Sequence, residues 1–372
     1  MKFFNLCSLS ILMLILCSCH KDHQPPGEQP VDVYVYGSLW HGSSTTSPTS
    51  ADAVYYKNGM QVILNDSGIS EPSTYVLTVN SLAVSGDTVY AGGSSTNNSY
   101  VTGSTLPVGP VYWINSIEHV LQVTNTISPV IVGIAANGKS FYTLYRGVPY
   151  PGNDGGLFKL GGIAINGSVK YQYNDVLIGL IISGTDLYTY GYTPGGGNNA
   201  ICYKNNQLIT LQVPANTNTA VITGMYIFGQ DVYACGILTN DNSSVPVYWK
   251  NGQLTMLISD TNTNTTGIAV QGENIYISGS QTTIGTNANG LPTKEAILWK
   301  NGLMTKLAAP SGYNSYTNGV VVSGNDVYVS GRAGSDSDCT VYWRNGTPVN
   351  FKIPAGYAFV NKGITIVPQT GH

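Results

Sequence analysis

The chain has 372 residues and a formal net charge of -3 at pH 7, and only 9% of its residues are charged, against about 25% in an average soluble protein. Its 44 Gly and 26 Tyr, and its shortage of the residues that build long helices, predict an all-β chain with many turns. The 16 Lys and Arg form no cluster, which argues against nucleic-acid binding because that function needs clustered cations.

Residues 1–18 have the layout of a signal peptide: Lys2 precedes an apolar stretch over 6–16, too short to span a bilayer comfortably, and small residues follow. The stretch ends in LCSC, whose last residue is Cys19. This motif resembles the lipobox of bacterial lipoproteins. The resemblance implies that Cys19 is lipidated and becomes the new N-terminus; the alternative is an ordinary secretory signal cut near Ser18.

The next segment, 19–30, contains HKDHQPPGEQP and is expected to be a polar tether, because it has no core-forming residues. His20 and His23 suit a disordered tether better than a metal pair. Similarity to lipoprotein sorting signals implies a lipid-anchored protein of the cell envelope, in the outer membrane, with surface exposure as a further option. Membrane attachment is then expected through the N-terminal lipid alone.

A short phrase recurs along the rest of the chain, as YYKNG, YWINS, IAING, CYKNN, YWKNG, LWKNG and YWRNG. Its Asn residues are 39 to 57 positions apart: Asn58, Asn115, Asn166, Asn205, Asn251, Asn301 and Asn345. Asn-Gly between two apolar runs is the strongest short signal for a hairpin, since both residues tolerate the positive φ of a type I′ turn. Each copy therefore predicts two strands joined by a tight turn.

A second phrase, of the type GNDVYVSG, precedes each hairpin after the first, and its aligned tyrosines are Tyr34, Tyr90, Tyr142, Tyr188, Tyr233, Tyr276 and Tyr328. A short apolar strand comes before six of them, so each unit should have four strands. The first unit lacks its first strand, and 361–367, NKGITIV, matches the missing piece. Such a displaced strand closes a ring and removes its open edges.

The sequence therefore predicts an all-β, seven-bladed β-propeller over 31–369, with four strands per blade and the first blade closed by the C-terminal strand. Periods of this length also fit WD40 and kelch propellers, but the signatures of both are missing. The chain resembles the YWKNG-repeat lipoproteins of bacterial envelopes, a resemblance that implies the fold and little about function. The Trp and Tyr of the repeated phrases are expected to pack between blades.

The irregular connections fall at one face of such a propeller: 38–52, 93–110, 145–156, 191–200, 236–246, 279–295 and 331–339. Because functional groups concentrate on loops held by a rigid scaffold, this face is the expected binding face. Aromatic rings among Asn, Ser and Thr suit sugars or peptides. The candidate ligand-binding residues are Trp40, His41, Tyr100, Tyr145, Arg146, Tyr150, Tyr192, Tyr313, Tyr316 and Arg332, with Tyr357 beside them.

Catalytic chemistry is sparse in the sequence. No catalytic constellation, multi-histidine metal site or phosphate-binding motif is found, so no catalytic residue, metal or cofactor is expected. The recurrent Asp186, Asp231 and Asp326 are expected to cap turns. Of the cysteines Cys202, Cys235 and Cys339, the first two form the only plausible disulfide, with unpaired buried thiols favoured over it.

We therefore expect a non-catalytic, monomeric envelope protein that presents its loop face to a glycan, a peptide or a partner protein. Two other functions stay open. One is a polysaccharide-acting enzyme that pairs loop carboxylates such as Asp154 and Asp336, which would have to lie roughly 5 to 9.5 Å apart. The other is a structural scaffold of the envelope.

Overall fold

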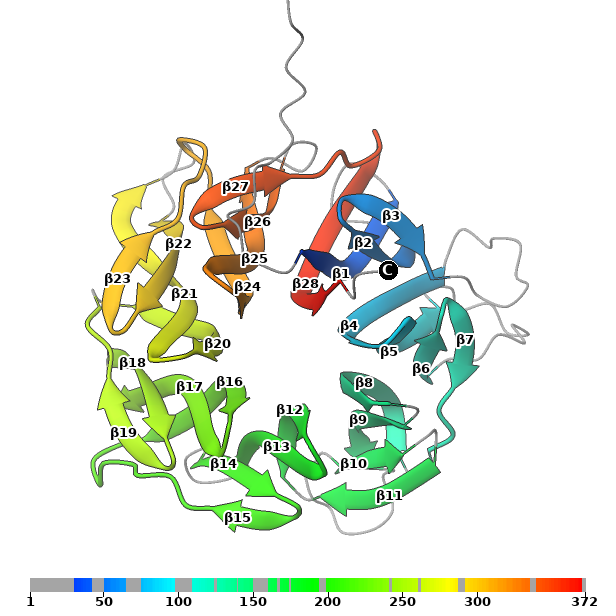
Figure 1. Ribbon diagram of the computed structural model, residues 1–372, viewed down its shortest axis with the longest axis horizontal. Helices are drawn as coiled ribbons and strands as arrows, with labels where there is room; N and C mark the ends of the chain where they lie inside the picture. The colour runs from blue at the N-terminus through cyan, green and yellow to red at the C-terminus, as the bar shows by residue number, and fades with distance from the viewer. Residues whose placement is uncertain are drawn as a thin grey trace, which may run out of the picture.

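The computed structural model describes residues 30–41, 50–64, 75–97, 109–123, 126–138, 140–149, 160–165, 168–173, 175–193, 199–240, 243–259, 262–286, 292–334 and 339–369. Every element in these ranges is a β-strand, and the strands are arranged as radial groups around a common centre (Figure 1). The prediction of an all-β propeller is confirmed. Nowhere in these ranges is there a helix with the length and apolar character needed to span a bilayer.

Five blades are separate four-stranded sheets. In chain order they are β8 (Thr126–Asn137), β9 (Ser140–Pro149), β10 (Leu160–Ile165), β11 (Ser168–Tyr173); β12 (Val176–Ser183), β13 (Asp186–Thr193), β14 (Asn199–Lys204), β15 (Gln207–Ile209); β16 (Thr219–Phe228), β17 (Asp231–Asn240), β18 (Ser243–Lys250), β19 (Gln253–Met256); β20 (Thr263–Gln271), β21 (Asn274–Thr286), β22 (Pro292–Lys300), β23 (Leu303–Lys306); and β24 (Ser315–Ser323), β25 (Asp326–Gly334), β26 (Cys339–Arg344), β27 (Thr347–Asn350).

The remaining strands form one eight-stranded sheet. They are β1 (Val31–His41), β2 (Ala51–Lys57), β3 (Met60–Ile63), β4 (Tyr75–Ser85), β5 (Thr88–Asn97), β6 (Gly109–Ile114), β7 (Ile117–Val120) and β28 (Tyr357–Pro368). A single parallel bridge, Ala51 to Val76, joins β2 to β4. The prediction of seven separate four-stranded blades is therefore wrong: five blades are four-stranded, and the repeat pattern carried no sign of the bridge that merges the other strands.

The two ends of the described chain are paired with each other. Strand β28 runs antiparallel to β1 along its whole length, from Val31 opposite Pro368 to His41 opposite Tyr357. Beyond the strand, the backbone N–H of Gln369 donates to the carbonyl of Pro30 at 2.7 Å. The C-terminal strand thus covers the edge that β1 would otherwise expose.

The first repeated phrase folds into tight turns, as predicted. Asn58 and Gly59 have φ values of 50° and 82°, which are those of a type I′ turn, and Asn251 and Gly252 have the same values. The Oδ1 atom of Asn58 accepts a hydrogen bond from the Val33 backbone N–H at 2.8 Å. Equivalent bonds recur in other units, so the turn between the third and fourth strands is fastened to the start of the second strand.

A carboxylate and a cation complete this arrangement, which we call the turn cluster: the turn Asn, the Asp at the start of the second strand, the Lys or Arg before the turn, and the Tyr two residues after the Asp. In one copy Asn251 Nδ2 donates to Asp231 Oδ1 at 2.7 Å, and Lys250 Nζ lies 3.0 Å from Asp231 Oδ2 and 5.3 Å from the centre of the Tyr233 ring. The turn cluster explains why the two phrases recur together.

The tryptophans of the repeat join neighbouring blades. Trp113, Trp249, Trp299 and Trp343 are fully buried. The Trp249 indole N–H donates to the carbonyl of Gln212, in the connection that follows the preceding blade, at 2.8 Å. Trp299 and Trp343 make the matching bonds to Ile258 and Ala308. The predicted packing role of these tryptophans between blades is confirmed.

The first strand of each unit lines the centre of the ring, and each contacts the next around the circle: β28, β4, β8, β12, β16, β20 and β24 (Figure 1). Each of these strands carries a β-bulge at the same position. In four units the side chain of the bulged residue reaches the next inner strand. Asn80 donates to Ile131 O, Asn318 donates to Asn361 O, and Thr223 and Thr266 bond to Thr265 and Thr317.

Candidate binding groove on the loop face

The two faces of the ring differ in their connections. We call the face with the tight turns, such as Asn251–Gly252 and Gly229, the turn face, and the opposite face, where second strands connect to third strands, the loop face. Because the turn Asn side chains bond to the starts of the second strands, both kinds of tight turn lie at the same face. The loop face then receives the variable connections, as expected.

A groove of about 390 Å³ lies on the loop face, at the inner ends of three consecutive blades. Its volume falls in the roughly 300–1,000 Å³ range of small-molecule sites. It is lined by Ile237, Ser244, Asn262, Thr263, Asn264, Thr266, Ser280, Gln281, Thr282, Lys294, Tyr316 and Thr317. We call it the loop-face groove. Most of its lining groups are hydroxyls and amides, with a single aromatic ring.

Hydrogen bonds within one blade and between it and the next hold the floor of the loop-face groove. Thr266 Oγ1 lies 2.6 Å from Thr317 Oγ1 and 2.9 Å from Ser278 Oγ. The Ser280 Oγ atom accepts from the Thr317 backbone N–H at 3.2 Å, and the Ser280 backbone N–H donates to Asn264 Oδ1 at 2.9 Å. These bonds fix the orientation of the polar groups before any ligand arrives, which reduces the entropy lost on binding.

Gln281 is a deeply buried polar side chain of the loop-face groove, with 2% of its surface exposed. Its Nε2 donates to Glu295 Oε2 at 2.8 Å. Its Oε1 atom has no hydrogen-bond partner among the described residues. An unpaired buried acceptor costs about 1–3 kcal/mol, so a ligand donor that reaches Oε1 after a small shift of the Gln281 side chain would recover stability that the free protein lacks.

Glu295 supports Gln281 from behind. Burial by itself would raise the pKa of Glu295, but hydrogen bonds from Lys306 and Gln281 outweigh that effect and lower the pKa. The Lys306 Nζ atom lies 2.8 Å from the carboxylate. Glu295 is therefore ionised at neutral pH and keeps the Gln281 amide turned with its N–H group toward the carboxylate and its carbonyl oxygen away from it.

Tyr316 is the one predicted ligand-binding residue that lines the loop-face groove, and 37% of its surface is exposed. Its cross-strand partner is Arg332, also predicted. Tyr313 lies three residues earlier and is 50% exposed, outside the lining of the groove. The backbone N–H of Lys294 donates to Asn314 Oδ1 at 2.9 Å, which positions the exposed Lys294 side chain beside Tyr316.

A second group of predicted residues lies where the chain ends pair. His41 Nε2 is 2.9 Å from Asp52 Oδ2, and the His41 ring meets the Tyr357 ring edge-on with centres 4.9 Å apart. Trp40 precedes His41 in β1 and is partly exposed. This cluster connects β1, β2 and β28. Its contacts fasten the closure of the ring at the loop face.

The other predicted ligand-binding residues that the structure describes do not line the loop-face groove. Tyr145 is 3% exposed and packs with Leu121, Ile131 and Ala164, so its ring takes part in the core. Arg146 lies in β9, and Tyr192 lies in β13. Their units are outside the set that forms the loop-face groove.

Several predicted residues lie outside the described ranges: Cys19, Tyr100, Tyr150, Asp154 and Asp336. Cys202 and Cys235 are free and buried, as favoured from the sequence, and burial raises the pKa of their thiols to about 12 and about 11. No group of three or more potential metal-ligating side chains is found within the described part of the chain.

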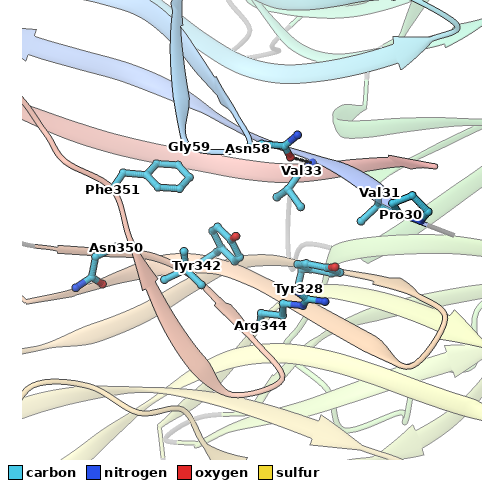
Figure 2. Close-up of a pocket in the computed structure, with 11 residues that line it drawn as sticks. Pro30, Val31, Val33, Asn58, Gly59, Tyr328, Tyr342, Arg344, Asn350 and Phe351 are labelled. Carbon is cyan, nitrogen blue, oxygen red and sulfur yellow. Dashed lines mark hydrogen bonds between the residues drawn. The ribbon is translucent and has the colours of Figure 1, made fainter. Parts of the chain in front are cut away.

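A second cleft, of about 410 Å³, lies on the turn face between β24–β27 and the sheet that contains β1, as Figure 2 shows. The Arg344 guanidinium and the rings of Tyr328, Tyr342 and Phe351 lie along it. Arg344 Nη2 donates to Asp326 Oδ2 at 2.6 Å, as part of a turn cluster. The Arg344 and Asp326 charges beside this cleft are thus engaged in holding the turn. The cleft is therefore a weaker candidate ligand site than the loop-face groove.

No protein-family model and no curated protein sequence matches the chain. Among solved structures, one chain of a nidogen/laminin complex is similar with a TM-score of 0.41 and 9% identity, over 92% of this chain and all (100%) of that one. An exo-1,5-alpha-L-arabinanase from a bovine ruminal metagenomic library has a TM-score of 0.34 and 10% identity, over 73% of this chain and 94% of that one. A sialidase of Trypanosoma rangeli has a TM-score of 0.34 and 7% identity, over 91% of this chain and 55% of that one. These similarities concern the fold alone.

Sequence reasoning named Tyr316 and missed the polar groups around it. Gln281 carried a signal that could have been found by aligning the units on their recurrent Tyr. The same position holds the buried residues Leu39, Leu238 and Ala333 in three other second strands, and Ser95, Gly147 and Thr193 in the remaining three. Gln281 is the only long amide side chain at this position, which marks it as different from its counterparts.

Proposed function

We propose that the protein is a glycan-binding propeller of the bacterial cell envelope, and that the loop-face groove holds the ligand. The observation that carries the proposal is the buried, unpaired Oε1 of Gln281 within a groove of hydroxyl and amide groups. A polyhydroxylated ligand supplies many O–H donors and can also accept from Thr and Ser hydroxyls. The exposed ring of Tyr316 offers an apolar face on which a sugar ring can stack.

The chemistry of the groove favours a glycan over an apolar peptide. Ile237 is the only aliphatic hydrophobic side chain among its lining residues. A hydrophobic peptide anchor would have to bury polar groups without partners, which costs free energy. Lys294 has no carboxylate partner within the described residues, so acidic sugars are the subclass that we expect to bind best.

The test is a panel of neutral and acidic oligosaccharides, followed by calorimetry on any that bind. Gln281→Leu introduces the residue that two other units carry at this position, as Leu39 and Leu238, so the fold should tolerate it. Gln281→Leu and Tyr316→Ala should each weaken glycan binding by about tenfold or more, which is the effect of losing one hydrogen bond or one stacking contact. Tyr313→Ala is the matched control, because Tyr313 is exposed nearby but does not line the groove.

Equal affinity of the wild type and both groove variants for the same glycan would place binding elsewhere and overturn the proposal. The control for Gln281→Leu is its thermal stability. If the variant is as stable as the wild type, its loss of glycan binding does not result from unfolding.

The location of the protein is part of the proposal. We infer from the LCSC motif that Cys19 is acylated and anchors the chain to the envelope membrane. Metabolic labelling with an alkyne fatty acid should give a labelled wild type and an unlabelled Cys19→Ala variant. Labelling that survives Cys19→Ala would show that the lipid is attached elsewhere.

A second candidate function is an enzyme that acts on a polysaccharide. The observation in its favour is Glu295, an ionised carboxylate that bonds to a residue lining the loop-face groove. Glycoside hydrolysis needs two carboxyl groups across the scissile bond, and the second would have to come from a loop residue such as Asp336 or Asp154. Release of reducing sugar from a bound glycan, lost in Glu295→Gln and Asp336→Asn, would favour the enzyme over the binding protein.

A further inference from the structure

The point where the propeller meets its tether lies on the turn face. Pro30 and Val31 line the turn-face cleft together with the turn residues Asn58 and Gly59 (Figure 2). The Val33 backbone N–H donates to Asn58 Oδ1, so β1 starts beside a tight turn. Ten residues lie between Cys19 and Pro30, and the segment from Cys19 to Pro30 can span at most about 40 Å when fully extended.

Exposed apolar side chains surround the same face. Five of them lie within two residues of a tight turn and are between 40% and 73% exposed: Met60, Ile117, Leu208, Phe228 and Leu303. We call these the rim residues. Four belong to the outermost strands β3, β7, β15 and β23, which are spread around the circumference in Figure 1. Contact points spread in this way can all touch one flat surface.

The charges of the turn face are balanced in pairs. Lys57, Lys204 and Lys250 lie 2.7, 2.8 and 3.0 Å from the carboxylates of Asp32, Asp186 and Asp231. Arg344 pairs with Asp326 in the same way. A surface that attracts anionic partners needs unpaired cations, and this face offers few. Its exposed apolar groups therefore decide what it can contact.

We propose that the turn face lies against the lipid bilayer through the rim residues, so that the loop-face groove points away from the membrane. This inference rests on the proposed lipid anchor at Cys19, which delivers the chain to the membrane at the turn face. A single acyl chain gives marginal attachment, and shallow burial of several apolar side chains adds to the attachment that a lipid anchor provides. The balanced charges predict that the orientation is insensitive to salt and to the fraction of anionic lipid.

The experiment tethers the folded chain to vesicles at the natural point, with residues 1–19 replaced by a hexahistidine tag on a nickel-chelating lipid. An environment-sensitive fluorophore is attached through Met60→Cys or Leu303→Cys on the rim. Matched probes are Ile258→Cys, exposed by 76% on the connection after β19, and Tyr313→Cys at the loop face. The probes are introduced into a Cys339→Ser variant, so that the thiol of Cys339 is not labelled. Cys202 and Cys235 are protected from labelling because they are buried and because the pKa of their thiols is raised.

Nitroxide lipids should quench both rim probes about threefold or more above the Ile258 and Tyr313 probes, at low and high salt and in vesicles of pure phosphatidylcholine. Equal quenching at all four sites, or stronger quenching at Tyr313, would overturn the orientation. Because the tag replaces the lipid, this outcome does not depend on acylation of Cys19. Glycan binding by the Met60→Cys and Leu303→Cys proteins, measured in parallel, reports separately on the loop-face groove.

Discussion

Single hydrogen bonds of buried tryptophans connect one unit to the next. Trp249 and Trp113 are both fully buried and occupy the same place in their units. The Trp249 indole N–H donates to Gln212 O, whereas the Trp113 indole N–H has no partner among the described residues. Comparing variants of Trp249 and Trp113 therefore separates the contribution of the hydrogen bond to the free energy of unfolding from the contribution of burial.

We predict that Trp249→Phe destabilises the protein by about 1–3 kcal/mol more than Trp113→Phe, because it leaves the Gln212 carbonyl without its donor. Urea unfolding of the two variants, compared at equal m-values, measures the difference. Equal losses would mean that the indole N–H adds nothing to the contact between units.

Asp326 is the most buried carboxylate of the turn clusters, at 8% exposure. Burial by itself would raise the pKa of Asp326, but hydrogen bonds from Arg344 and Asn345 lower it. A lowered pKa in the folded state means that the stabilisation is present above the unfolded-state pKa of about 3.9 and is lost as the pH falls through the folded-state value.

Asp326→Asn should therefore cost about 1–2 kcal/mol of unfolding free energy at neutral pH, and the cost should shrink as the pH falls below about 4. Asp231→Asn is the control, with a smaller effect expected because solvent screens the more exposed Asp231 and Lys250 pair. A cost that does not depend on pH would contradict the assigned role of the Asp326 charge.

At the scale of the element, one unit keeps the cation of the turn cluster without its carboxylate. Strand β21 begins with Asn274 where β13, β17 and β25 begin with Asp, and Asn301 Nδ2 donates to Asn274 Oδ1 at 3.1 Å. Lys300 still lies 5.5 Å from the centre of the Tyr276 ring, as its counterparts do over theirs. Here the cation keeps its aromatic contact and has no ion pair with a carboxylate among the described residues.

Asn274→Asp should restore the missing charge and stabilise the protein by up to about 1 kcal/mol, the range of a surface ion pair, with the gain removed by high salt. Thermal unfolding in low and high salt measures it. A destabilised variant would show that this unit has adapted to the neutral side chain.

The strands and turns could be predicted from the sequence because their signals are local and repeated seven times. The Asn-Gly turns and the recurrent Tyr place most hairpins, and NKGITIV identifies the C-terminal strand that pairs with β1. The Ala51 to Val76 bridge that merges two groups of strands was missed, since one bridge leaves no pattern. For the groove, an aromatic residue such as Tyr316 could be named, whereas Gln281 and Ser280 become neighbours of Thr317 only through packing between blades.

At the scale of the whole molecule, closure depends on β28. A chain that ends at Gly356 lacks β28 and leaves both β1 and the inner edge of β24 uncovered. We predict that it loses the cooperative thermal transition and aggregates, because exposed strand edges pair with other chains. A chain that lacks only residues 370–372 is the control and should unfold as the wild type does. A folded, monomeric protein ending at Gly356 would contradict the role of this strand.

The loop-face groove is the proposed ligand site of the whole molecule. The most direct test of this site is a crystal structure of the protein with the tightest-binding oligosaccharide from the panel. We expect a sugar ring stacked on Tyr316, with a hydroxyl within hydrogen-bond distance of Gln281 Oε1. Sugar density in the turn-face cleft beside Tyr342 and Phe351, with an empty loop-face groove, would contradict this expectation.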